Sequence, residues 1–151
     1  MFYFDKEDDR VLFCDIRDEE HIVTDSSSPG GERTVRIHPD VVADFRDLPF
    51  DDGAFSLVIF DPPHLKHAGK NSWLAKKYGT LPEIGWKEYL QHGLHECWRV
   101  LRQHGTLIFK WNEEQMRLGD LVDIFPDRPV MGQRRGKTIF VVFFKSRSKK
   151  H

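Results

Sequence analysis

A carboxylate and two prolines follow directly after an apolar run near the middle of the chain. Residues 57–60 are all apolar and rich in strand formers, which predicts a short strand buried on both faces, as in a parallel sheet. Asp61, Pro62 and Pro63 come next, and the strand must end there because proline cannot donate a ladder hydrogen bond and holds the preceding residue extended. We therefore expect a carboxylate and two stiff backbone carbonyls at the carboxyl edge of a sheet, where ligands bind in open α/β proteins.

The run Asp61-Pro62-Pro63-His64 resembles the Asp/Asn-Pro-Pro-aromatic motif of S-adenosylmethionine-dependent methyltransferases that modify exocyclic amines such as adenine N6 or cytosine N4. The resemblance implies that these four residues are catalytic. A carboxylate oxygen and a prolyl carbonyl can accept hydrogen bonds from both N–H groups of an amine. They would hold the amine in line with the methyl group and stabilise the positive charge that develops on nitrogen. His64 stands where the family has Tyr, Phe or Trp, and its smaller ring would stack on the extruded base.

Two further segments resemble the same family, in the same order along the chain. Residues 41–55 are similar to its third strand and the connection to the fourth, and residues 96–108 are similar to the helix, turn and fifth strand that follow. The resemblance spans residues 40–145 and implies an α/β, Rossmann-like class I methyltransferase fold. The sheet would be mostly parallel, with an antiparallel hairpin at its C-terminal end. The chain has no Gly-x-Gly, so the glycine-loop region in residues 1–40 would be reduced or remodelled.

The cofactor that the resemblance implies is S-adenosyl-L-methionine. The apolar residues 11–14 could form a buried strand that ends at Asp15. An acid at the end of the family's second strand binds ribose, and Asp15 could fill that role or lie in a solvated turn. Asp44 stands where the family places an acid near adenine. The cofactor-binding residues that we expect are Asp15, Asp44, Phe45, Arg46 and Asp61.

Residues 64–79 combine lysines with aromatic rings and follow the motif directly. Cations and flat rings suit a phosphate backbone and a stacked base, but the same residues could form a short surface helix over Trp73 and Leu74 with solvated lysines. Two more candidates, Lys110 and Trp111, end a predicted strand over 106–111, at the same edge as the motif. The expected substrate-binding residues are Lys66, Lys70, Trp73, Lys76, Lys77, Lys110 and Trp111.

The remaining elements are predicted from hydrophobic periodicity. Apolar residues at three- and four-residue spacing indicate an amphipathic helix over 84–103 that ends at Gly105. A short helix over 115–125, a basic hairpin turn at 132–137 and a strong strand over 138–144 follow. Residues 145–151 form a basic tail that could contact phosphates or only increase solubility.

Composition limits the class of protein. The 151 residues suit one domain, which we place over 1–151 with an atypical part at 1–40. The net charge of -1 gives no overall attraction to nucleic acid, although residues 128–151 contain Lys and Arg but no acid. Two distant cysteines predict a reducing compartment and no structural zinc, and His92 and His95 are not in the zincin order and have no evident third ligand, so we expect no metal site. No run of apolar residues reaches membrane-spanning length, so we expect a cytoplasmic protein that does not contact membranes.

Together these features predict an enzyme that transfers a methyl group from S-adenosylmethionine to an exocyclic amine of a base in DNA or RNA. The chain resembles prophage-type methyltransferases that lack a target-recognition domain. Sequence specificity would then be low, come from residues 64–79, or be supplied by a second subunit, either another copy of the chain or a partner. The base would be in a single strand or extruded. Two alternatives remain open: methyl transfer to a small-molecule or protein amine, and an inactive methyltransferase-fold subunit that binds nucleic acid.

Overall fold

The computed structural model describes residues 3–69 and 72–146. By its internal contacts the chain divides into two compact units, Met1–Phe45 and Arg46–His151. Each unit has its own strands, and each is described here by itself.

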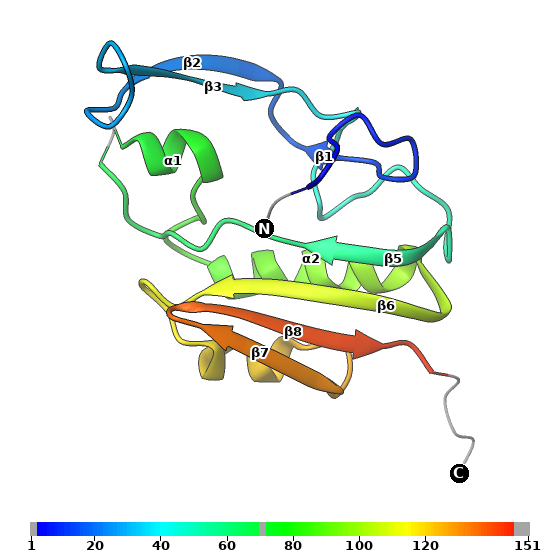
Figure 1. The fold of residues 1–151 in the computed structure, drawn as a ribbon. Coiled ribbons are helices and arrows are strands. Elements are labelled where there is room, and N and C mark those ends of the chain that lie inside the picture. Colours follow the sequence, from blue (N-terminus) through cyan, green and yellow to red (C-terminus); the bar gives the residue numbers. More distant parts are fainter. Residues whose placement is uncertain (1–2, 70–71, 147–151) are drawn as a thin grey trace. The chain divides into compact units, whose positions relative to one another are not determined.

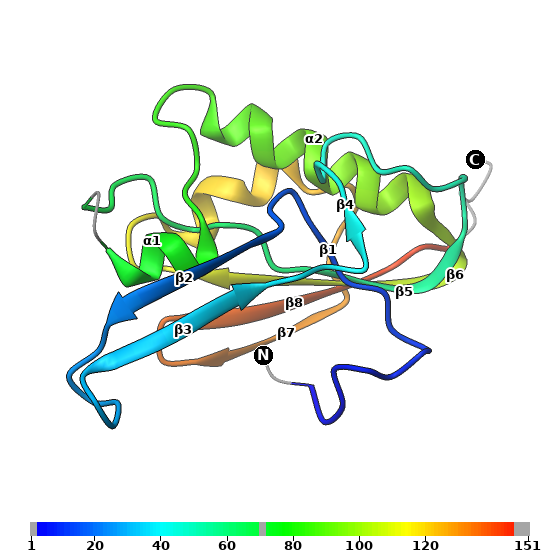
Figure 2. The same cartoon turned by 90° about the horizontal axis from the view of Figure 1, so that it is seen from above.

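The first unit contains short strands and, within its described residues, no helix. Strands β2 (Glu19–Thr24) and β3 (Glu32–Ile37) form an antiparallel pair, seen from above in Figure 2. Two-residue strands β1 (Cys14–Asp15) and β4 (Val41–Val42) pair in parallel. The predicted buried strand over 11–14 is wrong, because only its last residue is in a strand and Leu12 is exposed.

The second unit is built on a four-stranded sheet in the order β5-β6-β8-β7 (Figure 1). Its strands are β5 (Phe55–Phe60), β6 (Leu101–Asn112), β7 (Met131–Arg135) and β8 (Thr138–Phe144). Strands β5 and β6 are parallel, because helix α2 (Trp86–Val100) carries the chain back between them. The β6–β8 and β7–β8 pairs are antiparallel, and a tight turn at Gly136 joins the last two strands.

Helices cover one face of this sheet. Helix α2 and the 3₁₀ helix η1 (Leu118–Ile124) contact each other and lie on the same side of the strands (Figure 1). Alternate residues of β5, β6 and β8 point into the space between, where the rings of Phe60, Phe109, Trp111 and Phe143 belong to the core, whereas every residue of β7 is exposed. Helix α2 contributes residues at three- and four-residue spacing, namely Leu90, Gly93, Leu94, Cys97 and Val100.

The expected Rossmann-like class I fold with a mostly parallel sheet is wrong. Two of the three strand pairs in the four-stranded sheet are antiparallel, and helices make up 20% of the described residues against 32% for strands. A parallel pair needs a crossover of a dozen or more residues, and among the described residues only α2 provides one in this sheet. Residues 1–40 contain a β-hairpin in place of strand–helix units. The predicted C-terminal hairpin is the part of the fold that the structure confirms.

The predicted elements of the second unit differ at their ends. Helix α2 stops at Val100, and Gly105 lies inside β6, so the helix end predicted at Gly105 is wrong. The helix predicted over 115–125 is a shorter 3₁₀ helix. No helix in the described residues is long and apolar enough to cross a membrane.

Candidate functional site

Asp61 lies one residue beyond β5, beside the last part of β6. Phe60 pairs with Phe109 in the parallel register, so the next residue of each segment, Asp61 and Lys110, comes at the same level. Lys110 Nζ donates a hydrogen bond to Asp61 Oδ2 at 2.6 Å. Two segments that are 49 residues apart in sequence thus form a charged pair at the carboxyl ends of two neighbouring strands.

His64 lies among aromatic rings next to this pair. Its ring centroid is 6.0 Å from that of Tyr78 and 6.5 Å from that of Trp111, which it meets edge to face. Burial lowers the pKa of His64 below 6.5, and the cation of Lys110 acts in the same direction, while Asp61 and Glu114 oppose it. The imidazole is therefore mainly neutral at neutral pH.

The segment after the motif is tied to the turn that follows β6. The side-chain oxygen of Gln115 accepts hydrogen bonds from the backbone N–H groups of Lys66 and His67 at 2.7 and 3.1 Å. Its amide nitrogen donates to the carbonyl of His67 at 2.7 Å. A third connection runs from the N–H of Leu81 to the carbonyl of Leu65 at 2.8 Å. These bonds hold both ends of the segment that carries the next helix.

That helix, α1 (Trp73–Tyr78), is one of the two alternatives predicted for residues 64–79. Ser72 caps its N-terminus by accepting a hydrogen bond from the N–H of Ala75, and Gly79 ends it at a φ of 74°. Helix α1 buries none of its residues. Lys77 Nζ lies 5.6 Å from the ring centroid of Trp73 and 5.0 Å from that of Tyr78, so an ammonium group and two partly exposed rings share one surface.

The other predicted substrate-binding residues lie in different surroundings. Lys66 Nζ is 5.3 Å from the ring centroid of Trp86, at the start of α2. Trp111 is only 1% exposed and donates its Nε1–H to the carbonyl of Met116. The Trp111 ring is therefore part of the core beside His64, and its contact with a substrate stays a prediction. Lys70 lies outside the described residues.

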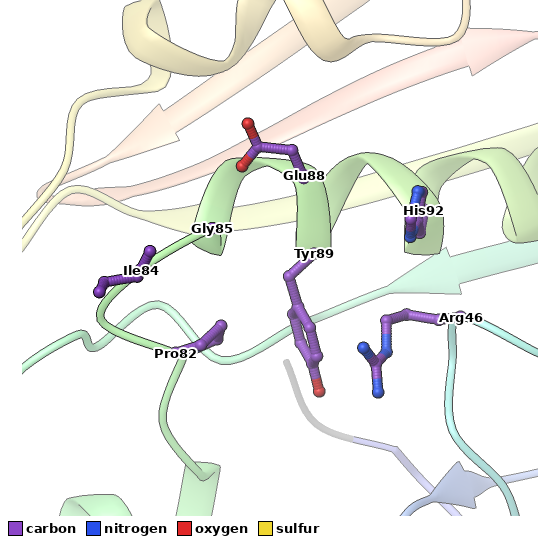
Figure 3. A pocket seen from close by; sticks show the side chains of 7 residues that line it. All are labelled: Arg46, Pro82, Ile84, Gly85, Glu88, Tyr89 and His92. Atoms are coloured by element: carbon purple, nitrogen blue, oxygen red, sulfur yellow. The ribbon is translucent and has the colours of Figure 1, made fainter.

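An open pocket of about 360 Å³ lies at the start of α2 (Figure 3). The Arg46 guanidinium carbon is 4.4 Å from the ring centroid of Tyr89, and Figure 3 shows the two side chains next to each other below the helix. The pocket is lined by Arg46, Pro82, Ile84, Gly85, Glu88, Tyr89 and His92. Pro82 directly follows Leu81, whose N–H donates to the carbonyl of Leu65. One wall of the pocket is therefore next in sequence to the segment that begins after His64.

Three of the expected cofactor residues belong to the first unit. Asp15 accepts hydrogen bonds from the backbone and the guanidinium group of Arg17, at 2.9 to 3.0 Å. Its carboxylate is thus engaged within its own turn, as in the solvated-turn alternative, and ribose binding stays a prediction. Asp44 and Phe45 follow β4, and Arg46 begins the second unit.

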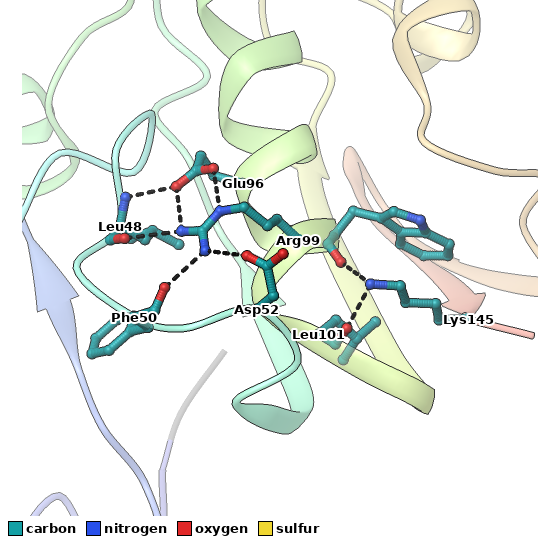
Figure 4. A network of polar contacts seen from close by, with 8 residues as sticks. Leu48, Phe50, Asp52, Glu96, Arg99, Leu101 and Lys145 are labelled. Carbon is teal, nitrogen blue, oxygen red and sulfur yellow. Dashed lines mark hydrogen bonds and ion pairs between the residues drawn. The ribbon is translucent and has the colours of Figure 1, made fainter.

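A second charged network, centred on Arg99, fastens residues 46–53 to the end of α2 (Figure 4). The guanidinium group donates to Glu96, to Asp52 and to the carbonyls of Leu48 and Phe50, at 2.7 to 3.0 Å. The hydrogen bond from Arg99 lowers the pKa of Glu96. Asp52, one of the turn acids after Pro49, is thus an ion-pair partner.

Lys145 closes the same end of α2. Its Nζ donates to the carbonyls of Trp98 and Leu101, which the helix leaves without partners (Figure 4). Lys145 is therefore a helix-capping residue, although the sequence suggested a tail. Burial lowers its pKa, and the nearby Asp52 acts in the opposite direction.

Sequence reasoning missed two residues that act on the site from beyond β6. Gln115 holds the backbone of Lys66 and His67, and the charge of Glu114 acts to raise the pKa of His64. Nothing in their local pattern singles them out, because their partners are far away in the chain. Within residues 3–69 and 72–146 no three His, Cys, Asp or Glu side chains are grouped in a way that could hold a metal ion.

Comparison of the chain with models of known protein families and with curated proteins found no match.

Proposed function

We propose that the chain is an S-adenosylmethionine-dependent methyltransferase that acts on an exocyclic amine of a nucleobase. The observation that carries this proposal is the group formed by the Asp61 carboxylate, the Pro62 and Pro63 backbone and the His64 ring at the carboxyl ends of β5 and β6. The proposal rests on the chemistry of these residues and not on the fold, since their resemblance to an amine-methylating motif is local.

The residues of the Arg46 and Tyr89 pocket fit the adenine part of such a cofactor. Its volume of about 360 Å³ is within the range of small-molecule sites. The Tyr89 ring and the planar guanidinium group of Arg46 are both surfaces on which a flat base can stack. Pro82 and Ile84 add apolar walls. When bound, S-adenosylmethionine supplies a methyl group attached to a positively charged sulfur.

The chain's own residues would orient the acceptor amine. Asp61 and the carbonyl of Pro62 accept hydrogen bonds from its two N–H groups, which places the nitrogen lone pair and offsets the positive charge that nitrogen gains. His64 packs its ring on the base. Because burial lowers the pKa of His64, the imidazole is neutral and does not repel that charge at neutral pH.

Helix α1 would bind the nucleic-acid strand that carries the base. Trp73 and Tyr78 are 39% and 37% exposed, which leaves ring surface for stacking. Lys76 and Lys77 lie in the last turn of the helix and can contact phosphates. Hydrogen bonds to Gln115 and Leu65 fix both ends of the segment that carries α1, so the position of the helix is constrained on both sides.

A second candidate is a nucleic-acid-binding module without methyl transfer. Two observations favour it. Two of the strand pairs in the sheet are antiparallel, and the chain has no Gly-x-Gly, the loop that approaches the methionine part of the cofactor in the family. This candidate keeps the role of α1 and gives Asp61 none.

The test is transfer of a radiolabelled methyl group from S-adenosylmethionine to single- and double-stranded DNA and RNA oligonucleotides. Wild-type protein is expected to label at least one of them. Asp61→Ala should lower turnover about a hundredfold or more, because the lost acceptor acts mainly as charge develops. Asp51→Ala is the matched control, since Asp51 is an exposed acid of the turn before β5, and it should leave turnover unchanged.

The outcomes separate the two candidates. Wild-type protein that binds oligonucleotides but labels none of them supports the binding module and contradicts methyl transfer. Near-normal turnover of Asp61→Ala contradicts the amine-orienting role of the motif. Base composition of the labelled product, read by nucleoside chromatography, then identifies adenine or cytosine as the acceptor.

A further inference from the structure

The two partners of the Asp61–Lys110 pair differ in how accessible they are. The Lys110 side chain is 16% exposed and that of Asp61 is 40% exposed. Lys110 comes from inside β6, with its stem along the sheet, whereas Asp61 is on the extended segment that leaves β5. A ligand at this edge would therefore meet the carboxylate first and the ammonium group behind it.

The two oxygens of the Asp61 carboxylate differ in their hydrogen bonding. Oδ2 accepts the hydrogen bond from Lys110 Nζ at 2.6 Å. Within the described parts of the chain, Oδ1 accepts none. A carboxylate held through one oxygen has a fixed rotamer and offers the other in a defined direction, which is what an acceptor for an amine needs.

We propose that Lys110 is a positioning residue for methyl transfer, which orients Asp61 so that Oδ1 accepts from the amine, and this inference rests on the proposed function. In the reaction, the amine nitrogen forms a bond to the methyl carbon while the carbon–sulfur bond breaks, and the electron pair of that bond stays on sulfur. The nitrogen becomes positively charged and then gives one proton to water. Lys110 keeps its own protons throughout and never touches the substrate.

The ammonium group of Lys110 holds Oδ2 and leaves Oδ1 for the amine. Lys110 was expected from the sequence to bind substrate directly, and in this proposal it acts only through Asp61.

The test compares Lys110→Met, Lys110→Arg and a control in the methyl-transfer assay with radiolabelled S-adenosylmethionine and the oligonucleotide that wild type labels. Lys110→Met keeps the apolar stem and removes the charge. It should lower kcat about tenfold or more with little change in KM for the oligonucleotide, because orientation is lost in the transition state while binding by α1 remains. Lys110→Arg should recover most of kcat, since a guanidinium group can also hold one carboxylate oxygen.

The control is Lys87→Met. Lys87 forms a similar pair, with Asp123 at 2.7 Å, and its side chain is 34% exposed. It connects α2 with η1 on the covered side of the sheet, so its loss should leave kcat and KM unchanged. Circular dichroism and thermal melting establish that each variant is folded.

Each outcome decides one question. Wild-type protein without methyl transfer contradicts the proposed function and this inference with it. Active wild type with an unchanged kcat for Lys110→Met contradicts the positioning role alone. If Lys110→Met does not fold, Lys110→Gln replaces it, because the shorter amide cannot reach Oδ2 in the same way. Lys110→Gln should lower kcat and leave KM unchanged. An unchanged kcat for Lys110→Gln would also overturn the inference.

Discussion

Gly105 shows at the scale of a single residue why β6 can follow α2 directly. Strand β6 begins at Leu101, directly after the helix, and turns at His104, which has a φ of 65°, and at Gly105, which is buried. Its pairing with β5 shifts in register between Leu101 and Thr106. A Cβ at this position would lie 2.6 Å from Leu101 Cδ1 and 2.8 Å from the carbonyl oxygen of Arg102. The backbone atom cannot move away as a flexible side chain could, so the turn depends on the absence of a side chain.

Gly105→Ala should therefore lower the free energy of unfolding by about 1–3 kcal/mol, the usual cost of overpacking a buried site. Gly119→Ala is the control, because a Cβ there has no atom within 4 Å. It should be neutral or stabilising by up to about 1 kcal/mol, since alanine restricts the unfolded chain. Urea denaturation followed by circular dichroism measures both, and equal stabilities for the two variants would show that the turn has room for a methyl group.

Strand β6 illustrates at the scale of an element how one segment can serve both core and site. Side chains alternate across a strand, and Leu107, Phe109 and Trp111 are buried under the helices. The intervening residues face the other side, and the alternation brings Lys110 out beside Asp61. Helix α1 is the opposite case, because it buries no residue and the segment that carries it is fastened at its flanks.

If α1 binds a nucleic-acid strand, its lysines and its rings should contribute in different ways. Lys76→Ala with Lys77→Ala should flatten the slope of log K against log salt by about 1–2 units, since each phosphate contact contributes a little under one. Trp73→Ala should cost about 1–3 kcal/mol of binding free energy with the slope unchanged, because stacking is not ionic. Fluorescence anisotropy of labelled oligonucleotides at several salt concentrations gives both quantities.

Lys87→Ala is the control for a lost cation outside α1, and it should change neither quantity. Single strands should bind more tightly than duplexes, because extruding a base costs a few kcal/mol. If the double variant leaves the salt slope unchanged, α1 does not contact the phosphates of the nucleic acid.

At the scale of the whole molecule, the two units differ in how much apolar surface they bury. The second unit contains the sheet, α2, η1 and nearly all of the buried apolar residues. The first contributes two buried valines, Val23 and Val35, one from each strand of a hairpin. A two-stranded hairpin by itself is marginally stable in water, so the first unit has little to resist local opening.

Hydrogen exchange should reveal this difference. Amides of β6 and β8 should exchange slowly, at rates set by global unfolding, because both strands are paired along their length and lie over the core. Amides of β2 and β3 should exchange orders of magnitude faster, through local opening that leaves the sheet of the second unit intact. Mass spectrometry of peptides after labelling for seconds to hours measures both, and equal protection of the two units would contradict this division.

The sequence alone predicted the elements whose signals are local. The apolar run 57–60 ended by Asp61 and two prolines predicted β5 and its end, which the structure confirms. The predicted burial of this strand on both faces is wrong, because β5 comes at one end of the strand order and Leu57 is 51% exposed. Three- and four-residue spacing predicted α2, and the uninterrupted β-branched and aromatic run predicted β8 with its hairpin partner. In each case the deciding physics is the periodicity of the backbone itself, or the missing N–H of proline, and neither depends on distant residues.

Only the tertiary structure decided which strands are neighbours and what the site side chains contact. The parallel β5–β6 register makes Lys110 the partner of Asp61. Packing buries the Trp111 ring in the core, and Gln115 holds the segment that follows His64. The resemblance to a mostly parallel fold failed for the same reason, because the direction of β8 beside β6 depends on the connection between them and not on the composition of either strand. Contacts between residues nearly 50 positions apart are chosen by competition among all possible pairings, and no local pattern encodes the outcome of that competition.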